Sequence, residues 1–302
     1  MTTITAAAAE MASEAPLKGR RPVSRSFWQT AWRRLARDRV ALVCGSILLL
    51  ILLAAIFAPL IAPYDPYRTS MTRRLLPIGD ARHWLGTDEL GRDLLSRLIY
   101  GGRMSLFMGF APVFLATMIG GTLGIVAGYC GGAINMAIMR ITDVFYAFPS
   151  VLLAVAISGV LGAGLVNSLV SLTLVFTPPI ARVAESVTTQ IRNQDYVEAA
   201  RATGASGWRI VFGHVLSNVT GPILIYASSM ISVAIVIASG LSFLGLGVSP
   251  PNAEWGLMLN TLRQSIYVAP VNAILPGIMI FVTSMSMNLI SDSLRSSMDV
   301  KV

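Results

Sequence analysis

Long stretches without charge are the feature that most constrains this sequence. Residues 40–62 contain no charged side chain, and as a helix they would be about 34 Å long, enough to cross the ~30 Å hydrocarbon core of a bilayer. Residues 104–181 contain only two charges, Arg140 and Asp143. Charged residues make up 13% of the 302-residue chain, about half of the roughly 25% that is usual in soluble proteins. We therefore expect an all-α protein that crosses a lipid bilayer.

Glycine clusters divide the uncharged stretches into six predicted transmembrane helices. The 104–181 stretch is long enough for three spans of about 20 residues each. Two glycine clusters interrupt it. The first consists of Gly128, Gly131 and Gly132, and the second of Gly159, Gly162 and Gly164, followed by Asn167. Glycine favours turns because it adopts backbone conformations that other residues avoid. A fifth span is expected at about 222–247 and a sixth at about 271–291, where charge is again absent from the sequence.

The distribution of cations predicts that both termini face the cytoplasm. Lys and Arg near the ends of spans are kept preferentially on the cytoplasmic side. With six spans and the termini inside, 15 of the 23 Lys and Arg residues lie inside and 8 outside. Seven of those eight lie in one predicted outer loop, residues 63–103.

The ends of the chain are predicted to differ from the spans. Residues 1–39 are expected to form a disordered cytoplasmic tail, rich in Ala, Ser, Thr and Pro, and then an amphipathic helix that leads into the first span. That helix is predicted from apolar residues among arginines, namely Phe27, Trp28, Trp32 and Leu35.

The other predicted segments are a first span at 40–62, a periplasmic loop at 63–103, a core with five spans at 104–291 and a cytoplasmic C-terminus at 292–302. The net charge of +8 lies mainly beside the first span, which favours membrane lipid over nucleic acid as a partner.

The sequence lacks the residue groupings of most enzymes and metal sites. Its two histidines and two cysteines are far apart, at His83, His214, Cys44 and Cys130, so no compact metal site is expected. Neither lysine stands in the phosphate loop that nucleotide hydrolysis requires. Three carboxylates lie close together in the predicted outer loop, at Asp88, Glu89 and Asp93. We expect them to be solvated and paired with arginine, and we expect no catalytic residue, metal or cofactor in this chain.

A row of glycines on the second span predicts a close helix contact. Gly120, Gly124, Gly128 and Gly132 recur every four residues and therefore lie on one helical face. Such rows let two backbones approach in a membrane, where lipid provides no hydrophobic drive for packing. The contact is expected either within this chain or with a second membrane subunit.

Residues 192–218 are predicted to form a helix, a bend and a second helix on the cytoplasmic side. Asn193 or Asp195 is expected to cap the first helix, and Gly204 stands where a left-handed cap is expected. Ser206 is expected to cap the second helix. The apolar face of that helix consists of Trp208, Val211, Phe212, Val215 and Leu216. Periodicity alone fits an amphipathic hairpin on the membrane as well as a docking element for a partner.

Within that unit, the run EAARATGASGWRIVFGHVLSN resembles the EAA loop of permease subunits of binding-protein-dependent ABC importers, in which EAA is followed by three residues, Gly and a later apolar stretch. Further stretches resemble the C-type permease of the dipeptide and oligopeptide group. They are HWLGTDELGRDLLSRLIYGGRMSLFMG from His83, MRITDVFYAFPSVLLA from Met139, LSFLGLGVSPPNAEWGLML from Leu241 and NLISDSLRSSMD from Asn288. The resemblance covers about 35–300 of the chain. It implies the type I ABC importer permease fold, with six transmembrane helices and cytoplasmic coupling helices, in a bacterial inner (plasma) membrane.

The resemblance also implies partners. They are a B-type permease, two ATPase subunits that hold ATP and Mg²⁺, and an external substrate-binding protein. Glu198, Ala199, Ala200 and Gly204 match the EAA motif and would dock in the ATPase groove, and Arg201 and Trp208 are expected to join them. Nucleotide binding by the ATPases would switch the spans between inward-facing and outward-facing states through this loop. One departure is Ser217, where family members commonly have Pro, and it leaves open how the loop enters the fifth span.

Three functions remain in competition. The first is import of dipeptides or oligopeptides, and the second keeps the architecture but imports nickel chelates, glutathione or glycosides. The third is a self-sufficient channel or ion-coupled carrier, which would need charged or polar groups at mid-membrane. Arg140 and Asp143, the charges that interrupt the spans, lie near an inner end in the predicted topology, which disfavours the third. Residues 63–103 and 250–269 are expected to contact a binding protein or to serve in gating.

Overall fold

The computed structural model describes residues 35–298 of the chain. In this part the regular elements are helices, and one isolated bridge joins Thr87 and Asp93. The fold is therefore all-α, as the uncharged stretches predict. Residues 1–34 and 299–302 lie outside the described part, and with them the predicted disordered tail and most of the predicted amphipathic helix.

Five helices in the described part are long and apolar enough to cross a membrane. They are α3 (Arg39–Ile56), α5 (Leu94–Cys130), α8 (Leu165–Arg192), α11 (Leu216–Phe243) and α13 (Pro270–Met298). Two shorter helices, α6 (Gly132–Tyr146) and α7 (Ser150–Leu161), meet at an angle of 87° and pass the same test as a pair. The break lies at Pro149, because proline has no N–H for the helical ladder and disfavours helical backbone at the residue before it. The predicted count of six is reached when this bent pair is taken as one span.

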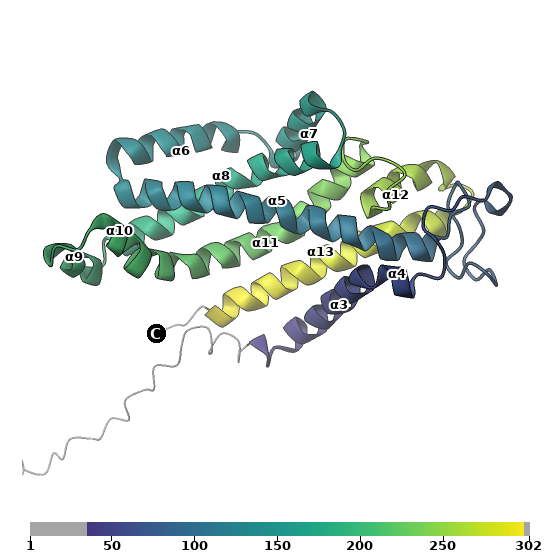
Figure 1. Cartoon of the computed structure of the whole chain (residues 1–302), viewed down its shortest axis with the longest axis horizontal. Helices are drawn as coiled ribbons and strands as arrows, with labels where there is room; N and C mark the ends of the chain where they lie inside the picture. The colour runs from purple at the N-terminus through teal and green to yellow at the C-terminus, as the bar shows by residue number, and fades with distance from the viewer. Residues whose placement is uncertain (1–34, 299–302) are drawn as a thin grey trace, which may run out of the picture.

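Short elements lie at the two ends of an elongated bundle (Figure 1). One end has α9 (Asp195–Ala202), α10 (Gly207–Ile210) and the π-helical turn η2 (Val211–Val215). The opposite end has α4 (Ala58–Ile61), the 3₁₀ turns η1 (Met71–Arg73) and η3 (Arg263–Ser265), and α12 (Trp255–Leu262). We call residues 193–210 the arm, and residues 62–93 together with α12 the cap. The arm and the cap therefore lie at opposite ends of the membrane-spanning helices.

Several helix boundaries differ from those expected, and the first span shows this in α3, which ends at Ile56 and not at 62. α5 begins at Leu94, ten residues before the predicted span, because the Asp93 side chain accepts a hydrogen bond from the Ser96 amide and caps the helix. The first turns of α5 thus carry Arg97 and Arg103 beyond the apolar stretch, and the irregular part of the predicted 63–103 loop ends at Asp93. α13 continues to Met298, seven residues past the predicted end at 291.

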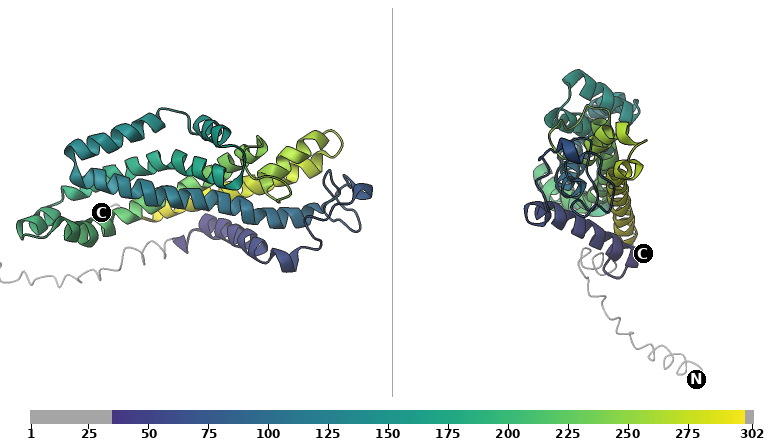
Figure 2. Two further views of the ribbon diagram at one scale, coloured as in Figure 1. Left: turned by 45° about the horizontal axis from the view of Figure 1, so that its top comes forward. Right: turned by 90° about the vertical axis from the view of Figure 1, so that its right-hand side faces the viewer.

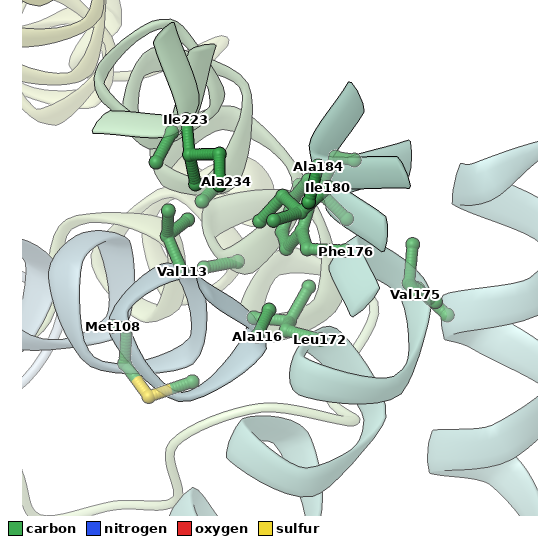
Figure 3. Close-up of a cluster of buried hydrophobic side chains, with 14 of the residues drawn as sticks. Met108, Val113, Ala116, Leu172, Val175, Phe176, Ile180, Ala184, Ile223 and Ala234 are labelled. Atoms are coloured by element: carbon green, nitrogen blue, oxygen red, sulfur yellow. The ribbon is translucent and has the colours of Figure 1, made fainter. Parts of the chain in front are cut away.

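The main core lies where α5, α8 and α11 meet, and Figure 2 shows these helices running along one another. Its buried side chains include Met108 and Val113 of α5, Leu172 and Phe176 of α8, and Ile223 of α11 (Figure 3). A second cluster forms at the cap around Trp255, which is fully buried. By contrast, many apolar side chains of α3 are exposed, as expected of a helix whose outer face meets lipid.

Candidate functional site

The bend in the arm is built on Gly204. Its φ of +80° lies in the left-handed region that favours glycine. The Ala205 amide donates to the Ala200 carbonyl at 3.1 Å, and the Gly204 amide donates to the Arg201 carbonyl at 2.9 Å. This is the Schellman pattern, which satisfies the last carbonyls of a helix. The structure therefore places Gly204 at the left-handed cap predicted for it.

The predicted N-caps of the arm are wrong in detail. Gln194 precedes α9 in the capping position, and its side chain makes no capping hydrogen bond. Asn193 instead ends α8, and Asp195 is the first residue of α9. Asp195 and Glu198 place their negative charge in the first turn, where it interacts favourably with the helix dipole. Ser206 does precede α10, but its side chain also makes no capping hydrogen bond.

The predicted second helix of the arm is continuous with the fifth span. α10 passes through the π-helical turn η2 directly into α11, so the stretch Gly207–Phe243 forms one membrane-crossing helix. The π turn inserts an extra residue per turn and shifts the side chains that follow it. The predicted apolar face is therefore divided, with Val215 buried while Trp208 and Phe212 are exposed. This also answers how the loop enters the fifth span, since Ser217 lies within the continuous helix at the start of α11.

A buried valine anchors the arm to the bundle. Val197 is fully buried and belongs to the main core cluster with Ile210 and Val215. On α9 as well, the Arg201 guanidinium lies 5.7 Å from the ring centre of Tyr129 on α5, a cation–π contact. Sequence reasoning missed both Val197 and Tyr129. Val197 carried a usable signal, an apolar residue directly before the EAA run, whereas the contact with Tyr129 depends on tertiary structure.

The opposite side of the arm is open. Glu198, Ala199 and Arg201 are exposed, and Ala200 is half-buried against the core. Trp208 is 75% exposed, and its ring stacks on Phe212 with a centroid distance of 5.5 Å. Tryptophan and arginine are among the residue types that dominate the binding energy of protein interfaces. The six residues of the EAA prediction thus lie on α9, on the Gly204 bend and on α10, all within the arm.

The glycine row packs on α8 of the same chain. A Cβ added to Gly120 would lie 2.5 Å from the Thr177 carbonyl oxygen, and one on Gly128 would lie 2.7 Å from the Glu185 carbonyl oxygen. A Cβ on Gly124 would lie 2.6 Å from the Cβ of Ala184. These distances leave no room for a side chain, so α5 and α8 approach through their backbones. Of the two alternatives left open by the sequence, the structure has the contact within the chain.

Gly132 differs from the rest of that row. It has a φ of +52°, and a Cβ there would meet nothing within 4 Å. It lies just after α5 ends, as the first residue of α6. Its role is therefore in the turn between the two helices and not in the α5–α8 contact.

The carboxylates of the cap are paired but not solvated, which corrects the expectation for this loop. Asp88 and Asp93 are buried, and the Arg92 Nε lies 2.6 Å from Asp88 Oδ2. The His83 Nδ1 lies 2.9 Å from Asp93 Oδ1. Burial, followed by the nearby charge of Asp88, raises the pKa of the Glu89 carboxyl. These groups form a polar core inside the cap, and His83 and Asp93 also line a hollow of about 350 Å³ beside it.

Long-range hydrogen bonds join the cap to the ends of the spans. The buried Arg97 of α5 donates from Nη1 to the Pro66 carbonyl at 3.0 Å and from Nη2 to the Asn252 carbonyl at 3.3 Å. The buried Asn272 of α13 donates to the carbonyls of Leu76 at 2.9 Å and Thr87 at 3.1 Å. Within residues 35–298, no group of three or more His, Cys, Asp or Glu side chains could hold a metal ion. The cap is therefore a braced structural unit.

An all-α bundle with several membrane-crossing helices, a folded cap at one end and a bent, exposed arm at the other has the form of a membrane permease subunit. Residues 120–301 match the family described as binding-protein-dependent transport system inner membrane component. Residues 26–77 match the N-terminal transmembrane domain of oligopeptide transport permease C. The chain therefore belongs to the binding-protein-dependent transport permeases and is the permease subunit of an ABC importer.

Similar proteins extend over nearly the whole chain. The glutathione transport system permease protein GsiD of Pectobacterium atrosepticum is 41% identical over 278 residues, which are 92% of this chain and 92% of that protein. The dipeptide transport system permease protein DppC of Alkalihalophilus pseudofirmus is 40% identical over 277 residues, 92% of this chain and 91% of that protein. Among solved structures, a chain of the inward-facing MetNI methionine ABC transporter superposes with a TM-score of 0.55 at 20% identity, covering 68% of this chain and 97% of that chain. This structural match confirms the type I permease fold.

Proposed function

We propose that this chain and a second, B-type permease together form the path of a short peptide across the inner membrane, and that the arm couples this path to two ATPase subunits. The observation that carries the proposal is the two-sided arm. Val197 fixes one side in the core, while Glu198 and Trp208 are exposed on the other. A partner that moves the exposed side therefore displaces the core helices as well, because closely packed cores transmit displacement.

The names of the relatives support a peptide as the cargo. The two proteins compared above are named for glutathione and for dipeptides, and both cargoes are short peptides with free carboxylates. Nickel chelates and glycosides remain the second choice of cargo, because none of the features described above favours them. A channel or ion-coupled carrier is disfavoured by membership of the importer family.

The orientation and the remaining partners follow from charge and position. We place both termini and the arm in the cytoplasm, since 15 of the 23 cations fall on that side. The cap then faces outward, where a substrate-binding protein would deliver the cargo. ATP and Mg²⁺ belong to the ATPase subunits in this proposal, and this chain supplies no catalytic group.

The test is peptide uptake into vesicles that hold the complete complex and its binding protein, with variants at Gly204. Proline requires a φ near −65° and is incompatible with the φ of +80° at this position. Gly204→Pro should therefore abolish ATP-dependent uptake while the subunit still inserts into the membrane. Gly204→Ala is the matched control, since a Cβ there meets nothing within 4 Å and the left-handed backbone costs about 1–2 kcal/mol. Unchanged uptake in the proline variant would contradict the coupling role of the arm.

A further inference from the structure

A cavity opens between three helices in the half of the bundle nearest the arm. Its volume is about 730 Å³, within the size range of small-molecule sites. Val183 and Val187 of α8 form part of an apolar wall. The polar lining comes from Asn218 and Tyr226 of α11 and from Arg295 of α13. The cavity thus combines apolar surface with hydrogen-bonding groups and a cation.

A neighbouring ion pair indicates that this side of the bundle does not face lipid. Asp143 of α6 and Arg182 of α8 form a salt bridge, and their side chains are 41% and 50% exposed. The Arg182 guanidinium also lies 5.3 Å from the ring centre of Tyr146. Charged side chains within membrane-spanning helices face the protein interior or water, because hydrocarbon does not solvate them. The half-exposed pair therefore requires water or another subunit beside it.

The ion pair and the cavity lie at the same level along α8. Arg182 directly precedes Val183, a lining residue of the cavity, on α8. This position lies about 15 Å along the helix from its end at Arg192, at a rise of ~1.5 Å per residue. Successive side chains point about 100° apart around a helix, so the pair and the cavity lie on neighbouring faces of α8 at one depth.

We propose that this cavity is the part of the cargo path that this chain contributes on the arm side, and that Arg295 and Tyr226 contact the carboxylate of a short peptide there. The proposal rests on the proposed function for its cargo. A guanidinium binds a carboxylate through two parallel hydrogen bonds, and the phenol and amide groups of Tyr226 and Asn218 supply further hydrogen bonds. Among the described residues that line the cavity none is acidic, and Arg295 places a positive charge there.

The first experiment measures water access with single cysteines in the complete complex. The native thiols are removed as Cys44→Ala and Cys130→Ser, and Val187→Cys or Tyr226→Cys is then added. The controls are Val43→Cys and Leu50→Cys on α3, where the native side chains are 60% and 66% exposed on the outer surface. A membrane-impermeant methanethiosulfonate reacts with thiolates, which form in water and not in hydrocarbon.

We expect the two cavity cysteines to react at least about tenfold faster than the two α3 cysteines, by the preference of the thiolate for water. A dipeptide added on the arm side should slow the reaction at Val187→Cys. Equal rates at cavity and α3 positions would overturn the proposal. If the labelling rate instead falls as the phosphatidylglycerol content of the membrane rises, and does not change when peptide is added, the cavity binds a lipid phosphate and the cargo assignment is wrong.

A second experiment tests the carboxylate contact. Protection of Val187→Cys is compared for a dipeptide and its C-terminal amide, in chains that carry Arg295, Arg295→Lys or Arg295→Gln. In the chain with Arg295, the free acid should protect the cysteine better than the amide. This difference in protection should be smaller in Arg295→Lys and should vanish in Arg295→Gln. Equal protection by acid and amide in the native chain would contradict the role of Arg295. Because labelling needs no ATP, a cavity that is water-accessible and protected by the free acid, in a complex that lacks ATP-dependent uptake, would refute the proposed function but leave the carboxylate contact of Arg295 standing.

Discussion

The indole nitrogen of Trp255 donates a hydrogen bond to the carbonyl of Leu98, 2.9 Å away in space and 157 residues away in sequence. Trp255 begins α12 and is fully buried, and the Trp255 amide also donates to the Ser105 hydroxyl at 3.1 Å. The ring lies against Gly101, where an added Cβ would be 3.0 Å from it. α12 is thereby fixed to the first turns of α5, and the cap is held to a membrane-spanning helix by buried contacts.

Removing the Trp255 side chain should destabilise the cap end strongly. Trp255→Ala should cost about 3–5 kcal/mol, as expected when a buried aromatic is truncated. Trp255→Phe keeps most of the apolar contact but loses the hydrogen bond, at about 0.5–1.5 kcal/mol. Thermal unfolding of the purified subunit in detergent measures both. Trp84→Ala is the control, because the Trp84 side chain is 69% exposed in the cap, and it should leave the midpoint unchanged. An equal loss in the Trp84 and Trp255 variants would contradict this account.

The carboxyl of Glu254 should make the stability of the cap depend on pH. Its oxygens accept from the Gly256 and Leu257 amides at 2.9 and 2.8 Å, yet burial raises its pKa above the ordinary value. The folded state then holds the proton more tightly than the unfolded state. This stabilisation is complete below the unfolded pKa of about 4.3 and is lost as the pH rises through the folded pKa.

The measurement is the unfolding midpoint of the native chain and of Glu254→Gln across the acidic range. Glutamine keeps the acceptor oxygen and removes the titration. The fall in stability with rising pH should therefore be smaller in Glu254→Gln than in the native chain. Parallel pH profiles would show that Glu254 does not contribute to the dependence.

The spans and the Gly204 bend were predictable because each depends on local chemistry. A stretch without charge has to lie in a bilayer or a core, so residues 40–62 identify the first span from composition alone. The bend at Gly204 was also predictable, since the helix formers before it end at a residue suited to a left-handed backbone. In both places a few adjacent residues determine the outcome.

The features that sequence reasoning missed depend on distant contacts or on competing local signals. The anchoring of Val197 requires partners from other helices, and the burial of the cap carboxylates depends on how their loop folds around them, neither of which periodicity identifies. α5 begins before its apolar stretch because Asp93 caps it and the buried network around Arg97 satisfies the charge. The π turn η2 divides the apolar face predicted for the second helix, and no residue pattern in the sequence indicated it.

The glycine at position 124 should be intolerant of even a methyl group. An added Cβ would lie 2.6 Å from that of Ala184, so Gly124→Ala should separate α5 from α8 and cost about 1–3 kcal/mol. Gly45→Ala on α3 is the matched control, because a Cβ there meets nothing within 4 Å and alanine is the better helix former. The unfolding midpoint should fall in the first variant and stay or rise in the second. A rise in both would mean that α5 and α8 do not pack through this glycine.

Truncation of Trp208 should impair coupling to the ATPase subunits while leaving the stability of the fold nearly unchanged. Its side chain is 75% exposed and stacks on Phe212, so Trp208→Ala should change the free energy of unfolding by less than about 0.5 kcal/mol. If the exposed indole docks on an ATPase subunit, its loss removes an aromatic contact of the kind that typically costs at least about 2 kcal/mol at an interface. Cargo-stimulated ATP hydrolysis by the reconstituted complex should then fall severalfold. Trp84→Ala, an exposed tryptophan at the opposite end of the bundle, controls for the loss of an indole as such. Native ATPase stimulation in Trp208→Ala would show that Trp208 is not part of the docking surface.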